Sequence, residues 1–249
     1  MTDAAHALST IDAKEVAKFE AIAAEWWDPD GKFKPLHLMN PCRLDYILNQ
    51  IAGQFGTRRG RNALAGLSVV DVGSGGGLIA EPMARLGANV TGLEAAEGNV
   101  AVAAAHAATM GLTIDYRVET AEAAAAGGAQ FDVVIALEIV EHVADVPAFI
   151  DAICALVRPG GLLIMSTLSR TAKSWAGAIV GAERVLRWLP VGTHDWNKFL
   201  TPEELETAIN ATGLEVVDSK GMVLNPISGD WSLSDTDLSM NYILTAEKA

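Results

Sequence analysis

Short apolar runs alternate with helical patterns along most of the chain. The apolar runs predict buried strands over 67–72, 89–93, 113–118, 131–137, 162–167, 214–219 and 241–247. Between them, the spacing predicts helices over 78–86, 99–110 and 146–157, and another that begins at Thr201 with a proline at its first helical position. The alanine-rich stretches near Ala101 and Ala121 also favour helix. This alternation predicts an α/β fold with a doubly wound, mostly parallel sheet.

Residues 1–60 are predicted to form a helical cap on a single domain that spans 1–249. Asp12, with Glu15 three residues later, marks a helix start, and the following apolar residues keep helical spacing: Val16, Phe19, Ile22 and Trp26. This helix is predicted to end at the Asp-Pro-Asp-Gly turn of 28–31, and a second helix to run over 41–54. An insertion over 169–197 separates the fifth predicted strand from the helix that begins at Thr201.

The composition excludes several classes of protein. A chain of 249 residues that is half apolar can bury a full core, and its formal net charge of −13 argues against a nucleic-acid partner. The sequence contains neither an uninterrupted apolar run of about 18 residues nor a recognisable secretory signal. Cys42 and Cys154 lie far apart without a partner motif, which favours a reduced, cytoplasmic location over a disulfide.

The strongest chemical signal is the glycine-rich segment DVGSGGG, which follows the first predicted strand. Glycines there let the backbone pass close to a ligand. Gly73, Gly75 and Gly77 form G-x-G-x-G, not the G-x-G-x-x-G of dinucleotide-binding proteins. The acid that precedes them, Asp71, could partner the ammonium group of S-adenosylmethionine (SAM), which carries no phosphate. The segment therefore favours SAM as the cofactor.

Glu94 ends the second predicted strand, at the position where a carboxylate can accept hydrogen bonds from both ribose hydroxyls. An acid at this position serves NAD equally well, so Glu94 alone does not choose between the cofactors. The alternative is a solvated acid after a strand. Together with the glycines, Glu94 indicates a cofactor that contains a nucleoside.

Most of the sequence resembles the class I SAM-dependent methyltransferases, which have a Rossmann-like fold. The resemblance is carried by DVGSGGG, TGLEA, FDVVIALEIVEHVADV and LVRPGGLLIMSTLSR. Two flanking segments, EWWDPDGKFKPLHLMNPCRLDYI and STLSRTAKSWAGAIVGAERVLRWLPVGTHDWNKF, are similar to the ubiquinone-biosynthesis O-methyltransferases, and this likeness runs from about 20 to 244. The family usually has Cys in place of Ser74 and Asp in place of Glu94. Neither change should abolish cofactor binding, because Ser is small and Glu keeps the carboxylate.

The family resemblance implies an enzyme that methylates polyprenylated catechols, namely 2-polyprenyl-6-hydroxyphenol and 3-demethylubiquinol, in ubiquinone biosynthesis. The alternatives are a methyltransferase for another small phenolic or acidic metabolite, an NAD-dependent oxidoreductase, and a non-catalytic lipid-binding subunit. The resemblance also implies cofactor contacts at Arg43, Gly73, Glu94 and Leu137. An arginine can clamp the methionine carboxylate with two parallel hydrogen bonds. The alternatives are that Arg43 is a surface residue and that Leu137 is simple core.

Three candidate residues for the acceptor side follow the fourth predicted strand: Glu138, Glu141 and His142. If a helix begins there, they share one face and could hold a divalent ion. The resemblance implies that they bind Mg²⁺. The alternative is a metal-free site in which His142 lines the acceptor pocket. His142 is then a ligand or, with Glu141, part of the acid–base machinery. His37 and His194 are secondary candidates.

The insertion over 169–197 carries a possible membrane contact. Its apolar residues fall on one helical face: Trp175, Ala178, Ile179, Ala182, Val185, Leu186 and Leu189. Its charged residues are mainly basic: Arg170, Lys173, Arg184 and Arg187 against Glu183. This pattern predicts a membrane-surface helix that serves a lipid-borne acceptor, or a helix that covers the active site. We therefore expect a cytoplasmic protein that associates peripherally with the inner membrane. It could also belong to a complex of ubiquinone-biosynthesis enzymes.

Overall fold

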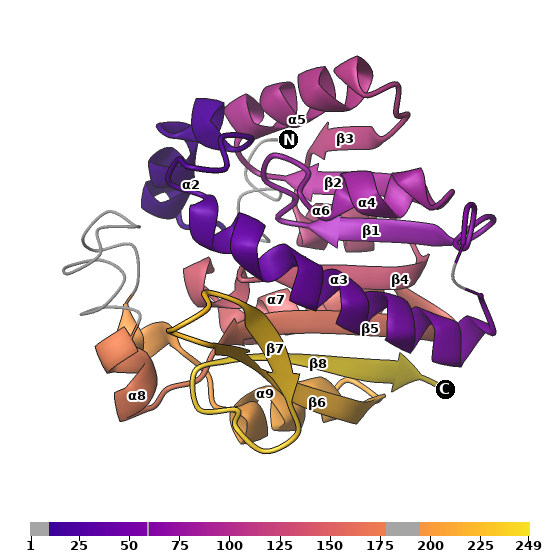
Figure 1. The fold of residues 1–249 in the computed structure, drawn as a ribbon. Coiled ribbons are helices and arrows are strands. Elements are labelled where there is room, and N and C mark those ends of the chain that lie inside the picture. The colour runs from indigo at the N-terminus through magenta and orange to yellow at the C-terminus, as the bar shows by residue number, and fades with distance from the viewer. Residues whose placement is uncertain (1–9, 59, 178–194) are drawn as a thin grey trace.

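One sheet runs through the computed structural model, which describes residues 10–58, 60–177 and 195–249 (Figure 1). Its strands are β1 (Ser68–Val72), β2 (Asn89–Glu94), β3 (Asp115–Val118), β4 (Phe131–Leu137), β5 (Val157–Leu168), β6 (Leu214–Leu224), β7 (Trp231–Ser234) and β8 (Asn241–Lys248). Their order is β3-β2-β1-β4-β5-β8-β6-β7. The pairs from β3 to β5 are parallel, whereas β8, β6 and β7 join antiparallel. The predicted fold class is confirmed.

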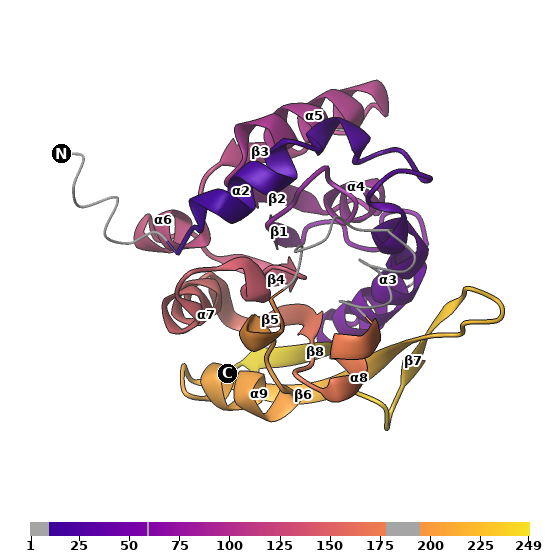
Figure 2. The same ribbon diagram turned by 90° about the vertical axis from the view of Figure 1, so that its left-hand side faces the viewer.

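Helices cover both faces of this sheet. The α-helices are α2 (Ala13–Glu20), α3 (Lys34–Phe55), α4 (Ala80–Arg85), α5 (Glu97–Thr109), α6 (Ala121–Ala126), α7 (Val146–Ala155), α8 (Ala172–Ser174) and α9 (Pro202–Asn210). The described residues also include three short 3-10 helices: η1 (Ala23–Glu25), η2 (Val140–His142) and η4 (Trp196–Lys198). Figure 2 shows α3 and α4 on one side of the sheet and α6 and α7 on the other.

Alternate residues of the central strands supply the two halves of the core. Val69 and Ile135 pack with α3 and α4, whereas Val70 and Val134 pack with α6, α7 and α9. All four side chains are fully buried. When both faces of a strand are buried, its sequence is an apolar run without alternation. This is why the sequence alone predicted β1 and β4.

The N-terminal helices differ from the prediction at their ends. Asp12 caps α2 as expected, because its carboxylate accepts from the Lys14 backbone N–H at 3.0 Å. However, α2 ends at Glu20 and a turn and η1 follow, so the predicted extension to 28 is wrong. The start of α3 at Lys34, not 41, is a second correction: Pro35 occupies its first turn, and Pro41 lies inside the helix. Pro41 forgoes one backbone hydrogen bond, but the helix continues because its apolar face is buried in the core.

Strand boundaries also differ toward the C-terminus. β5 begins at Val157, where it pairs with Phe131, although Arg158-Pro159-Gly160-Gly161 had indicated a turn. β6 continues past the predicted end to Leu224 and pairs with β7, a strand that was not predicted. β7 has only four residues, and its place is determined by pairing with β6 and by packing of Trp231 and Leu233 against the core.

Most of the predicted amphipathic insertion falls in 178–194 and lies outside the described residues, as does His194. At the near edge of the insertion, the Thr171 and Ser174 side chains form a capping box around α8. Trp175 follows with an exposed side chain. Within the described ranges, no helix is both long and apolar enough to cross a membrane.

Candidate active site

A cavity of about 460 Å³ opens at the carboxyl ends of the parallel strands. The strand order reverses at β1, which lies between β2 and β4, and open α/β sheets bind ligands at such a switch point. In Figure 1, α2 lies beyond the ends toward which β1, β2 and β3 point. Five of the predicted cofactor residues line the cavity: Arg43, Gly73, Gly75, Glu94 and Leu137. The topology therefore brings together residues that are far apart in the sequence.

The loop after β1 needs glycine for two reasons. Gly73, Gly75 and Gly77 have φ of 70°, 50° and 92°, in the left-handed region. A Cβ on Gly73 would also lie 2.4 Å from Ile139 Cδ1, and one on Gly75 would lie 2.4 Å from the ring of Trp26. This glycine cradle therefore packs too closely against Ile139 and Trp26 to carry side chains at these two positions.

Glu94 ties the end of β2 to this loop. Its Oε2 accepts from the Gly75 backbone N–H and its Oε1 from the Ala96 N–H, both at 2.9 Å. Burial raises the pKa of this carboxyl group, although the two backbone donors oppose the shift. Each carboxylate oxygen can accept more than one hydrogen bond. Glu94 can therefore hold the loop and still receive hydroxyl donors from the cavity.

Asp71 occupies a different position from the other predicted cofactor residues. Its side chain is buried behind the loop, and the Ala80 backbone at the start of α4 donates to it. Burial raises the pKa of Asp71 to about 7. Asp71 is not among the described residues that line the cavity. Its place suits support of the loop, and direct contact with an ammonium group stays a prediction.

Arg43, on α3, places a buried positive charge in the cavity. It is only 3% exposed, and its Nη2 lies 2.9 Å from Glu138 Oε1 as an ion pair. Neither Nε nor Nη2 has an aligned hydrogen-bond acceptor among the described residues. A buried guanidinium with unsatisfied donors is well suited to bind a carboxylate. Leu137 ends β4 beside it, half-buried and in the cavity wall.

The three predicted metal ligands do not share a helical face, and this part of the prediction is wrong. Glu138 has φ of 50°, which breaks the helical path directly after β4. Only the short η2 follows, and it does not include Glu138, so residues at i, i+3 and i+4 do not share one helical face here. Glu138 accepts from Ser166 Oγ at 2.7 Å and from Asn241 Nδ2 at 3.3 Å, besides its ion pair with Arg43.

Glu141 and His142 each contact a residue that is not a partner of Glu138. Glu141 is buried and accepts from Thr167 Oγ1 at 2.8 Å, while its Oε1 has no hydrogen-bond partner. Burial, helped by the charge of Glu138, raises the pKa of Glu141 to about 7. His142 Nδ1 lies 2.9 Å from Glu15 Oε2. Across the described ranges, no three His, Cys, Asp or Glu side chains are grouped so that they could hold a metal ion. The residues as placed therefore do not fit the predicted Mg²⁺ site.

His142 lines the cavity and pairs with a residue that sequence reasoning assigned only to a helix start. Burial lowers the pKa of His142, but the hydrogen bond with Glu15 and the charges of Glu141, Glu15 and Glu138 outweigh it, so the net shift is upward. The hydrogen bond with His142 is the largest cause that lowers the pKa of Glu15, to about 2. The two shifts agree on an ionised Glu15 beside the imidazole.

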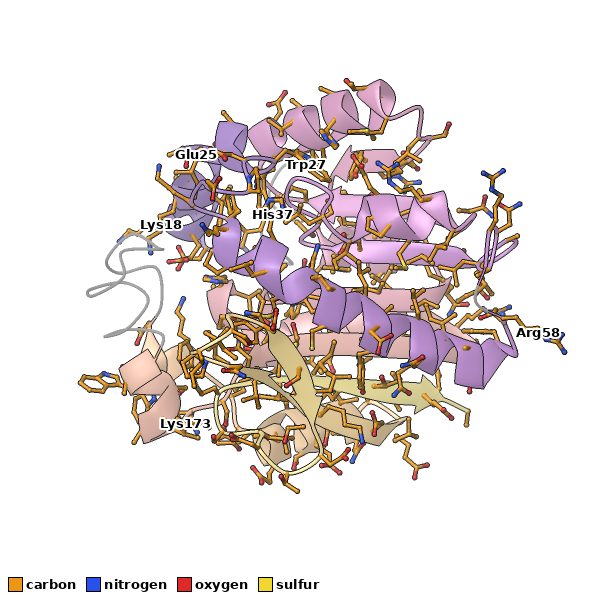
Figure 3. The ribbon with its side chains drawn as sticks, in the orientation of Figure 1. Lys18, Glu25, Trp27, His37, Arg58 and Lys173 are labelled. Atoms are coloured by element: carbon orange, nitrogen blue, oxygen red, sulfur yellow. The ribbon has the colours of Figure 1, made fainter. Side chains whose placement is uncertain are left out.

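Two tryptophans that sequence reasoning did not assign to the site cover the glycine loop. Trp26 donates to Asn99 Oδ1 at 2.9 Å and stacks on Phe33. Trp27 donates to the Gly76 carbonyl at 2.9 Å. The ring of His37 lies 2.8 Å from the Trp26 carbonyl, which makes this histidine part of the covering segment. Figure 3 shows Trp27 and His37 together near the glycine loop, with Arg58 at the opposite end of α3.

Comparisons with known proteins agree with this geometry. A family model described as a methyltransferase domain matches residues 36–219. Ubiquinone biosynthesis O-methyltransferases from Dinoroseobacter shibae and Ruegeria pomeroyi are each 61% identical to this chain, over 94% of it and 95% of the relative. Among solved structures, magnesium protoporphyrin IX methyltransferase from Synechocystis with bound SAM has a TM-score of 0.63 at 17% identity. That alignment covers 97% of this chain and 100% of the other, and it supports the fold.

Replacing Glu94 by Gln is expected to weaken binding of S-adenosylhomocysteine roughly 10- to 100-fold, because hydrogen bonds to a charged acceptor contribute about 1.5–3 kcal/mol. Affinity in the unaltered protein should fall as pH drops through the raised pKa of Glu94, since the ionised carboxylate is the better acceptor. Titration calorimetry at several pH values measures both effects. Glu97→Gln, an exposed change of the same type in the next helix, is the control. Equal affinities of the Glu94 and Glu97 variants would contradict the assignment.

The scattered partners of Glu138, Glu141 and His142 predict that the protein without added cofactor or acceptor shows no saturable Mg²⁺ binding. Calorimetric titration with MgCl₂ after EDTA treatment and dialysis checks this expectation. Binding of one equivalent that disappears in Glu141→Gln would restore the assignment of these residues as a metal site.

Proposed function

Because the chain belongs to the ubiquinone biosynthesis O-methyltransferase family, we propose that it transfers the methyl group of SAM to a hydroxyl of polyprenylated catechols. The acceptors would be 2-polyprenyl-6-hydroxyphenol and 3-demethylubiquinol. One observation carries the proposal: a single cavity is lined by the glycine cradle, Arg43, His142 and several apolar side chains.

The cofactor side of the cavity fits SAM. Gly73 and Gly75 of the glycine cradle line the cavity without side chains, so a ligand can approach the backbone. Arg43 has donors suited to the carboxylate of the methionine end. Glu94 has acceptors for the ribose hydroxyls. When bound, SAM supplies an electrophilic methyl group on a sulfonium. The protein's own part is to hold this group in line with the acceptor oxygen and to exclude water.

The acceptor side is apolar. The cavity lining includes Val16, Phe19 and Ile22 of the N-terminal segment and also Val143 and Phe149. Val16 and Phe19 of α2 are half-buried and line the cavity, so a bound molecule can contact them. Such a wall suits an aromatic ring with a hydrocarbon substituent better than a charged metabolite.

A catechol hydroxyl must lose its proton to become a good nucleophile, and His142 is the described residue best placed to accept it. It lines the cavity, whereas Glu141 is buried against Thr167 and does not. Glu141 then acts on His142 through its charge. This assignment needs no metal ion, in keeping with the different hydrogen-bond partners of Glu138, Glu141 and His142.

An acceptor with a polyprenyl tail resides in lipid, so we also propose that the enzyme works at the cytoplasmic surface of the inner membrane. The predicted contact through 169–197 is supported by the exposed Trp175 at the start of that segment. Association with other ubiquinone-biosynthesis enzymes is a further prediction from the family.

A direct assay tests the function. The purified enzyme with methyl-labelled SAM should methylate a short-chain polyprenyl catechol, and the product should carry the label on oxygen. The same catechol without its prenyl chain should react more slowly, because it leaves the apolar wall uncovered. No transfer to either catechol, or preference for the compound without a tail, would contradict the proposed acceptor.

His142→Asn should lower kcat roughly 10²- to 10⁴-fold, the usual contribution of a positioned general base. Binding of S-adenosylhomocysteine should stay within about twofold, because the glycine loop and Glu94 are unchanged. His106→Asn, a change of the same type at a histidine outside the cavity lining, is the matched control. A His142 variant with wild-type kcat would remove this residue from the chemistry.

A further inference from the structure

A carboxylate on the N-terminal helix contacts the proposed base across 127 positions of sequence. Glu15 lies in the first turn of α2, and its Oε2 is 2.9 Å from Nδ1 of His142. Both side chains are largely buried, at 15% and 13% exposure, and both line the cavity. We propose that Glu15 is the positioning residue that orients the His142 ring for proton transfer, an inference that rests on the proposed function.

The contact determines which nitrogen of the ring can act. An ionised carboxylate only accepts hydrogen bonds, so Nδ1 must carry the hydrogen. The neutral imidazole then has its lone pair on Nε2, the nitrogen that would take the proton. Lys18, 2.6 Å from the other oxygen of Glu15, favours the ionised carboxylate. Glu15 thus selects the tautomer as well as the orientation.

The ring is held from a second side by the same helix. Phe19 meets His142 edge-on, with ring centroids 5.2 Å apart and planes at 88°. Glu15 and Phe19 are four residues apart and therefore neighbours on one face of α2. One helical face thus supplies both the polar and the apolar contact to the imidazole.

The position of α2 is itself fixed next to η2. The Ala144 backbone N–H donates to the Thr10 carbonyl at 2.8 Å, and Thr10 Oγ1 donates to Glu122 Oε1 at 2.5 Å. Both contacts precede the helix by a few residues and anchor its start. Phe19 of α2 also packs against the buried cluster that contains Trp26 and Phe33, so the helix keeps its place without the Glu15 contact.

The rival interpretation is that Glu15 and His142 form an ion pair whose only role is to hold α2 in place. The two interpretations predict different effects when the contact between Glu15 and His142 is broken. A purely structural pair would weaken cofactor binding, acceptor binding and thermal stability together when broken. A positioning residue would change kcat and the tautomer of His142 while binding is retained.

Three variants distinguish the two interpretations: Glu15→Ala, Glu15→Asp and the control Glu20→Ala. Glu20 is an exposed acid on the same helix, and it is not among the residues that line the cavity. We expect kcat to fall roughly 10- to 100-fold in Glu15→Ala, to recover in part in Glu15→Asp, and to stay unchanged in Glu20→Ala. The acceptor KM and the affinity for S-adenosylhomocysteine should stay within about twofold.

A measurement without substrate tests the inference independently of the proposed reaction. In ¹⁵N spectra of the protein at alkaline pH, His142 should show the hydrogen on Nδ1, and this preference should be lost in Glu15→Ala and kept in Glu20→Ala. An unchanged tautomer, or a loss of kcat that only parallels lost binding and stability, would overturn the role of Glu15. Absence of any methyl transfer by the unaltered enzyme would instead refute the proposed function and leave the spectroscopic result standing.

Discussion

The hydrogen bonds between the glycine loop and the end of β2 are the constraint on which the site depends. The backbone N–H groups of Gly73 and Ser74 both donate to the Leu93 carbonyl, at 2.8 and 3.1 Å, and Gly75 donates to the Glu94 side chain. These bonds require the left-handed backbone that glycine adopts without strain. They bring the ends of β1 and β2 together, and the rest of the cavity is arranged around that junction.

The N-terminal segment completes the site that the sheet begins. Trp26 and Trp27 pack on the glycine loop, and Glu15 reaches His142 beyond β4. The same short stretch of chain therefore contacts both the proposed cofactor side and the proposed acceptor side. A methyl transfer needs both partners aligned in a dry cavity, and a segment that touches both sides can provide this alignment.

Two carboxylates that line the cavity have separate partners. Glu138 is held by Arg43, Ser166 and Asn241. Glu15 is held by Lys18 and His142. The acids after β4 therefore have different hydrogen-bond partners, although their charges still act on one another. This explains why a pattern typical of metal ligands in the sequence does not become a ligand set in the fold.

The α/β architecture and the glycine loop could be predicted from the sequence, which also favoured SAM as the cofactor. These features are local: a doubly buried strand is a short apolar run, and a backbone with positive φ beside a ligand needs glycine. Tertiary structure alone decided that Glu15 pairs with His142, that Asp71 lies behind the loop, and that β7 joins the sheet. Such facts depend on contacts between distant segments and on one left-handed residue, Glu138, whose backbone no spacing rule predicts.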